Sequence, residues 1–84
     1  MKYVIVTVRD RVADVFGQPF FVARVGQAIR SFSDEVNSPN SDSAIAKHPE
    51  DFDLYELGLF DDETGTFEAV PPRQIAIGKD LKSK

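Results

Sequence analysis

The segment from residue 24 to 36 most constrains the fold, because it carries a single apolar stripe at helical spacing. Side chains three and four residues apart lie on one face of an α-helix, so this stripe predicts an amphipathic helix with one buried face. Arg24 and Arg30 fall outside the stripe. Such a helix needs a second layer to pack against. The stripe consists of Val25, Ala28, Ile29, Phe32 and Val36.

The second layer is predicted to be a β-sheet. Residues 2–9 are rich in β-branched side chains and predict a central strand covered on both sides. We expect a single α+β domain over residues 1–77, a small, mostly antiparallel sheet of four to five strands packed against one amphipathic helix. Residues 78–84 are expected to form a flexible basic tail. The other predicted strands are 20–23, 52–60, 66–70 and a short last one at 74–77.

The connections between these elements are predicted from their turn residues. The polar segment 9–18 can hold one helical turn, and residues 37–49 form a loop long enough to be functional or mobile. Gly65 suits the left-handed position of a hairpin loop. The consecutive prolines Pro71 and Pro72 are expected to stop the strand ladder, since proline has no backbone N–H to donate.

Charge is divided unevenly along the chain, although the net charge is only −4. Residues 1–31 carry five cationic side chains and two carboxylates. Residues 32–70 carry one cationic side chain and eleven carboxylates, and residues 71–84 carry four cationic side chains and one carboxylate. This asymmetry indicates a molecule with two faces. The basic ends could meet phosphate, or the acidic middle of a second copy, or they could fold back on their own acidic segment.

Several classes of protein are not expected from this composition. The chain has no cysteine, which excludes disulfides, thiolate nucleophiles and sulfur-ligated zinc, and which fits a reducing cytoplasm. The first apolar run is too short for a signal peptide, and no segment approaches the ~20 apolar residues of a membrane span. His48 is the only histidine, and the chain has no nucleophile elbow or phosphate-binding glycine loop. We therefore expect no enzyme and no cofactor.

The acidic segment raises the questions of metal binding and acid–base chemistry. Asp51 and Asp53 have the spacing of calcium-loop ligands, but apolar residues follow where further ligands would stand. A solvated hairpin turn is therefore the preferred interpretation, and no metal site is expected. Strand alternation places Glu56 on the same face as Phe52 and Leu54. Glu56 is either a carboxylate in an unusual setting or part of a barely buried rim.

A basic and aromatic set gives the more serious candidate site. Proteins that hold single-stranded nucleic acid combine cationic grooves with aromatic faces on which bases stack. Adjacent phenylalanines in a strand point to opposite faces of the sheet, so one of them is exposed if one face is open to solvent. The alternative is that every aromatic is core, and a pI near 4.8 also opposes general DNA binding. The candidate nucleic-acid-binding residues are Arg9, Arg11, Phe20, Phe21, Arg24, Arg30 and Arg73.

Three separated blocks of sequence resemble a known family. They are RDRVADVFGQPFF at 9–21, AIRSFSDEVN at 28–37, and HPEDFDLYELG at 48–58 followed by FDDETG. Together they resemble the small nonstructural protein of gokushovirus-type microviruses, which are phages with circular single-stranded DNA genomes. The resemblance implies a DNA-binding or nonstructural role in viral DNA synthesis or in the switch to single-stranded genome production. It implies no catalytic residue.

The functional hypothesis combines this resemblance with the basic, phenylalanine-rich first third. We expect a non-enzymatic phage accessory protein that binds single-stranded DNA in genome replication or packaging, in the cytoplasm of the infected bacterium. The alternative is a protein-binding adaptor or homodimeric regulator that acts on a phage replication or capsid protein and does not contact DNA. The protein is expected to form homo-oligomers and not to bind membranes.

Overall fold

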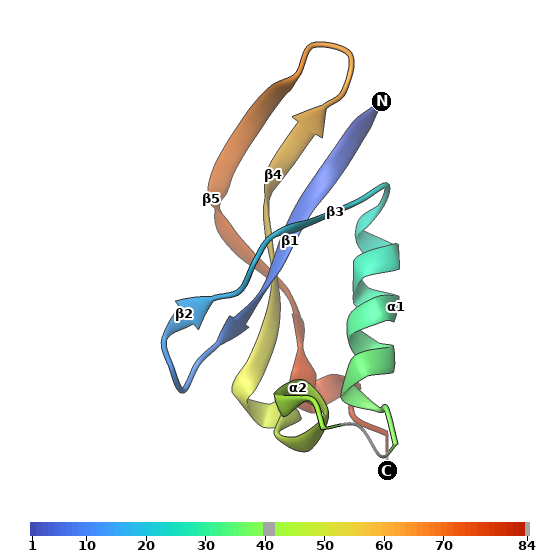
Figure 1. Cartoon of the computed structure of the whole chain (residues 1–84), viewed down its shortest axis with the longest axis vertical. Helices are drawn as coiled ribbons and strands as arrows, with labels where there is room; N and C mark the ends of the chain where they lie inside the picture. Colours follow the sequence, from blue (N-terminus) through green and yellow to red (C-terminus); the bar gives the residue numbers. More distant parts are fainter. Residues whose placement is uncertain (40–41, 84) are drawn as a thin grey trace.

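The computed structural model describes residues 1–39 and 42–83. Its elements run along a molecule of 42 × 23 × 19 Å, with the tip of a long hairpin at one end and the short helices at the other (Figure 1). In chain order they are β1 (Lys2–Asp10), β2 (Val15–Phe16), β3 (Phe20–Val22), α1 (Val25–Val36), α2 (Ala44–Lys47), the 3₁₀ helix η1 (Pro49–Asp51), β4 (Phe52–Asp61), β5 (Thr66–Ile77) and α3 (Gly78–Leu81).

The strands form one antiparallel sheet in the order β2-β1-β4-β5, and β3 also pairs with β1. The predicted α+β architecture is confirmed, with β1 as a central strand. Strands β2 and β3 pair with opposite ends of β1, so together they cover one of its edges. Strand β5 pairs only with β4 in this strand order and lies at the far side of the sheet.

Helix α1 packs on one face of the sheet, as its apolar stripe predicts. Ala28, Phe32 and Val36 are buried and cluster with Val6 of β1 and Leu54 of β4. These side chains exclude water from both layers, which is the main source of stability in a domain of this size. The start of α1 is stabilised by Gln27, whose Oε1 accepts the backbone N–H groups of Ala23 and Arg24 at 3.0 and 3.2 Å.

The segment after β1 is a hairpin, so the predicted helical turn within residues 9–18 is wrong. The Asp10 carboxylate accepts the backbone N–H groups of Val12 and Ala13 at 3.0 and 3.2 Å, which closes a side-chain turn. Asp14 then takes a left-handed conformation with a φ of 58°. Asp10 pairs with Val15 across this turn. Local side-chain hydrogen bonds therefore favour a turn over a helix here.

The two prolines do not stop β5, contrary to the prediction from the sequence. Glu56 pairs with Arg73, and Gly58 pairs with Ala69, so three residues of β5 lie opposite Leu57 alone. This bulge contains Pro71 and Pro72. It lies on the outermost strand, where a missing backbone N–H leaves no partner unsatisfied.

Two predicted irregular segments contain helical turns. The 37–49 loop includes α2, whose first turn is capped by the Ser43 hydroxyl, which accepts from Ile45 N at 3.1 Å. The predicted tail at residues 78–84 is corrected for its first part, because Gly78–Leu81 form α3. Asn37 Nδ2 donates to the Leu81 carbonyl at 3.0 Å, and Leu81 packs against the core. Leu81 is the apolar contact that holds this turn to the domain.

Candidate nucleic-acid interface

The sheet has a second face that none of the described helices covers. Side chains alternate along β1, and its α1-side residues, such as Val4 and Val6, join the core. The cluster also takes in Ile45 of α2 and Leu81 of α3, so these short helices lie on the same side. The opposite side carries a set of rings that we call the aromatic face. It consists of Phe16, Phe21, Tyr55, Phe60 and Phe67.

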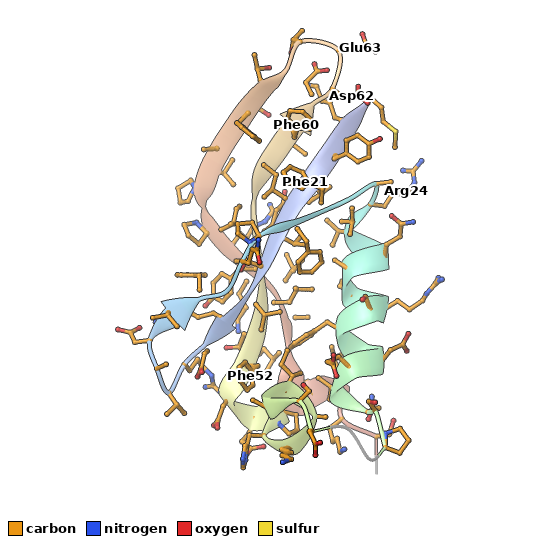
Figure 2. The ribbon with its side chains drawn as sticks, viewed as in Figure 1. Phe21, Arg24, Phe52, Phe60, Asp62 and Glu63 are labelled. Atoms are coloured by element: carbon orange, nitrogen blue, oxygen red, sulfur yellow. The ribbon has the colours of Figure 1, made fainter. Side chains whose placement is uncertain are left out.

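Three phenylalanines from three strands form one group of this aromatic face. The centroids of the Phe21 and Phe60 rings are 5.6 Å apart, and those of Phe60 and Phe67 are 5.2 Å apart. Figure 2 shows Phe21 and Phe60 side by side over the half of the sheet nearest the hairpin tip. Phe21 is 50% exposed and Phe67 is 67% exposed. Exposed apolar side chains that adjoin one another make this group the first candidate for an interaction surface.

A second group lies farther along the same face. The Phe16 and Tyr55 rings meet edge to face, with centroids 5.3 Å apart. The Arg9 guanidinium lies 5.5 Å from the Phe16 ring centroid, within the range of a cation–π contact. An Arg9 nitrogen also donates to Asp14 Oδ1 at 2.5 Å, and this hydrogen bond raises the pKa of Arg9 above its usual value. A cation and two rings are thus held together on the sheet surface.

The predicted phosphate-binding arginines fall into two groups. Three of them are ion-paired within the chain: Arg9 with Asp14, Arg11 with Asp53 at 3.2 Å, and Arg73 with Glu56. The other two, Arg24 and Arg30, are exposed at the start and in the middle of α1, with no ion pair among the described residues. Acidic and basic segments therefore fold back on one another in part, as one of the charge interpretations expects.

The predicted site residues are not brought to a single surface. Arg9 and Phe21 lie on the aromatic face, as their pairing with Phe16 and Ile5 requires. Phe20 points to the other side, where it lines a groove with Val8 and Phe32. Arg73 reaches Glu56, which pairs with Val6 on the α1 side. Adjacent Phe20 and Phe21 thus point to opposite faces, as predicted.

Four aromatic residues of this surface were not predicted from the sequence: Phe16, Tyr55, Phe60 and Phe67. Hairpin register is the signal that could have found two of them. The loop after Asp61 pairs that residue with Thr66, which places Phe60 directly opposite Phe67. A one-residue shift in the loop would separate these two rings. Phe16 and Tyr55 become neighbours only through β1, which lies between their strands.

The acidic tip of the β4–β5 hairpin lies at one end of the aromatic face. The Met1 amino group donates to Asp62 Oδ1 at 2.6 Å and to Glu63 Oε1 at 3.3 Å. Figure 2 shows both carboxylates at the tip of the β4–β5 hairpin. The hydrogen bond to Asp62 raises the pKa of the Met1 amino group. Gly65 takes the predicted left-handed conformation in this loop, with a φ of 69°.

Two carboxylates of β4 are buried. Glu56 lies on the α1 side as strand alternation predicts, and its side chain is bound by Arg73. Asp53 is more deeply buried, at 3% exposure, and its burial was not predicted. Arg11, beyond the end of β1, forms an ion pair with it, with 3.2 Å between Arg11 Nε and Asp53 Oδ2. Both carboxylates pair with arginines, so we interpret both pairs as structural.

Removing the arginine from one of these pairs gives a testable result. Arg73→Ala leaves Glu56 buried without its cation, so we expect a loss of about 1–3 kcal/mol in the free energy of unfolding. Urea unfolding followed by circular dichroism measures it. The double variant Glu56→Leu/Arg73→Ala is the control and should regain most of the loss. A fully stable Arg73→Ala protein would show that the pair contributes nothing.

Metal binding was not expected, and residues 1–39 and 42–83 contain one group of side chains that could hold an ion. His48, Glu50 and Asp51 can bring one ligand atom each within 4.8 Å of one another in η1 and its preceding residue. His48 and Glu50 are exposed and Asp51 is half-buried. Solvated acidic groups of this kind are common without an ion.

Comparison with protein families agrees with the phage part of the sequence resemblance. A family model described as "Phage ORF5 protein" matches residues 3–81. The chain belongs to the phage ORF5 protein family. This phage ORF5 protein matches no curated protein and no solved structure. In the part of the chain that the structure describes, no helix has the length and hydropathy to cross a membrane.

Proposed function

We propose that this phage ORF5 protein binds single-stranded DNA on its aromatic face and acts, without catalysis, in viral genome replication or packaging in the cytoplasm of the infected bacterium. The observation that carries the proposal is the group formed by the exposed Phe21 and Phe67 with the half-buried Phe60, on the uncovered side of the sheet. The resemblance to the gokushovirus nonstructural protein supports it, since those phages package single-stranded DNA.

Stacking is the main source of affinity in this proposal. A base stacked on an aromatic side chain contributes about 1–3 kcal/mol and tolerates any sequence, because every base has a π-face. The rings of Phe21 and Phe67 have open surface for such contacts. Duplex DNA keeps its base faces covered by neighbouring base pairs, so the aromatic face selects single strands.

Electrostatics make the proposed binding weak. Three of the five candidate arginines are already ion-paired, and the net charge of −4 repels phosphate. Few counterions are then released on binding, so the logarithm of the affinity should fall only shallowly with the logarithm of the salt concentration. Arg24 follows β3 closely and supplies an unpaired cation near the start of α1 (Figure 2).

Fluorescence anisotropy of labelled oligo-dT tests the proposal. Phe21→Ala and Phe67→Ala should each weaken binding at least fivefold, since each removes a stacking surface. Phe20→Ala is the matched control, because it makes the same change at the neighbouring position on the other side of the sheet. It should stay within about twofold of the wild type. Equal effects of Phe20→Ala and Phe21→Ala, or no binding at low salt, would contradict the proposal.

A second candidate function is binding of a protein through the same face, either a second copy or a phage replication or capsid protein. The ion pair of Arg9 with Asp14 favours protein binding. It leaves a polar group without net charge beside the apolar rings, which suits the rim of a protein–protein interface. Sedimentation velocity of the purified protein distinguishes self-association from DNA binding. A monomer at high concentration that still binds oligo-dT would argue against a homodimer on the aromatic face.

A further inference from the structure

We infer that Asp14 occupies the phosphate site of Arg9, and that a phosphodiester of single-stranded DNA takes the place of the Asp14 carboxylate while an adjoining base stacks on Phe16. The inference rests on the proposed function and adds to it a nucleotide-sized site on the Phe16 side of the aromatic face. Its elements are the Arg9 guanidinium, the Phe16 ring and the carboxylate that now binds the guanidinium.

The Arg9 guanidinium lies where a nucleotide would need a cation. It lies over the Phe16 ring, 5.5 Å from the centroid, and Phe16 is 44% exposed, so a base that stacks on the open part of this ring has the cation beside it. The Arg9 nitrogen that binds Asp14 is Nη2, and the Arg9 side chain is 32% exposed, so an oxygen from solution can reach it once Asp14 leaves. A planar guanidinium can bind two oxygens of a phosphate in place of one carboxylate.

Asp14 can leave Arg9 without unfolding the turn. Its side chain is 78% exposed, so the freed carboxylate would be fully hydrated. The turn itself is closed by Asp10, which accepts two backbone N–H groups. An exposed ion pair of this kind is weak, so its replacement reduces the DNA affinity by about fivefold at most.

Arg11 gives a contrasting case in the same region. Its partner Asp53 has a side chain only 4% exposed, in a pair of 3.2 Å. Withdrawing Arg11 would leave a buried carboxylate without its cation, which is costly. The Arg11 pair should therefore stay closed when DNA binds, and only the Arg9 pair opens.

A double-mutant cycle with labelled oligo-dT tests the inference. Asp14→Asn should tighten binding about two- to fivefold, because it removes the competing charge, and asparagine tolerates the left-handed backbone at this position. Asp14→Gly should also tighten binding, since glycine too adopts a positive φ readily. Asp34→Asn on α1 is the control for the change in net charge. In a protein that carries Arg9→Gln, Asp14→Asn should increase the affinity for oligo-dT no more than Asp34→Asn does.

The outcomes separate this inference from the proposed function. Binding that depends on Phe21 but responds equally to Asp14→Asn and Asp34→Asn would overturn the Asp14 inference alone. An identical gain with and without Arg9 would overturn it as well. Absence of oligo-dT binding in every variant at low salt would overturn the proposed function, and the Asp14 inference with it. A gain that requires Arg9 supports both.

Discussion

Phe32→Asp is expected to leave no folded protein. The Phe32 side chain is 4% exposed and lies in the core with Val6 and Leu54. Truncating a buried phenylalanine costs about 3–5 kcal/mol, and a buried unpaired carboxylate adds further cost. Domains have a total stability of about 5–15 kcal/mol, and one of this length lies toward the lower end. The substitution therefore removes most or all of the stability.

Far-UV circular dichroism and thermal melting measure this effect. Ser31→Asp is the matched control, because it introduces the same residue one position earlier on the exposed side of α1. It should melt close to the wild type. A cooperative transition retained in Phe32→Asp would refute the packing of α1 on the sheet.

Gly58→Ala is expected to have the second-largest effect. Gly58 has a φ of +148°, which side-chain-bearing residues rarely adopt. A Cβ here would overlap the Glu68 carbonyl oxygen and would lie 3.1 Å from the Ala69 Cα, both in the backbone of β5. Neither can move without separating β4 from β5. We expect a loss of about 3 kcal/mol or more.

Gly26→Ala is the control for this substitution. Nothing lies within 4 Å of a Cβ built at Gly26, which sits in the first turn of α1. Alanine should there be neutral or stabilise the protein by up to about 1 kcal/mol, since it favours the helix. The urea midpoint of Gly58→Ala should therefore fall, while that of Gly26→Ala should stay the same or rise. A Gly58→Ala midpoint equal to the wild type would refute the close approach of the two strands.

The helix and the strands of this protein could be predicted because their patterns are local. The stripe from Val25 to Val36 has helical spacing within one segment, and residues 2–9 are rich in β-branched side chains. The continuity of β5 could not be predicted in this way. It depends on a bulge that opposes Leu57 to three residues, a relation between two strands that local propensity does not contain.

The candidate site was predictable only in part for the same reason. Opposite orientations of Phe20 and Phe21 follow from strand alternation alone. The grouping of Phe21 with Phe60 and Phe67 requires the register of three strand pairs, which involve four strands. Ion pairing was equally non-local, since Arg11 and Asp53 are far apart in sequence. A count of arginines therefore overstates the cations that are free to bind phosphate.

The proline-containing bulge of β5 also bears on whether another chain can extend this sheet. An outer strand normally offers a row of free N–H and C=O groups that can pair with another chain and start a fibre. Pro71 and Pro72 interrupt that row, because neither has an N–H, and the bulge bends the strand where they lie. Pairing of another chain along this strand is therefore interrupted at the bulge, beside apolar rings that remain open to a ligand.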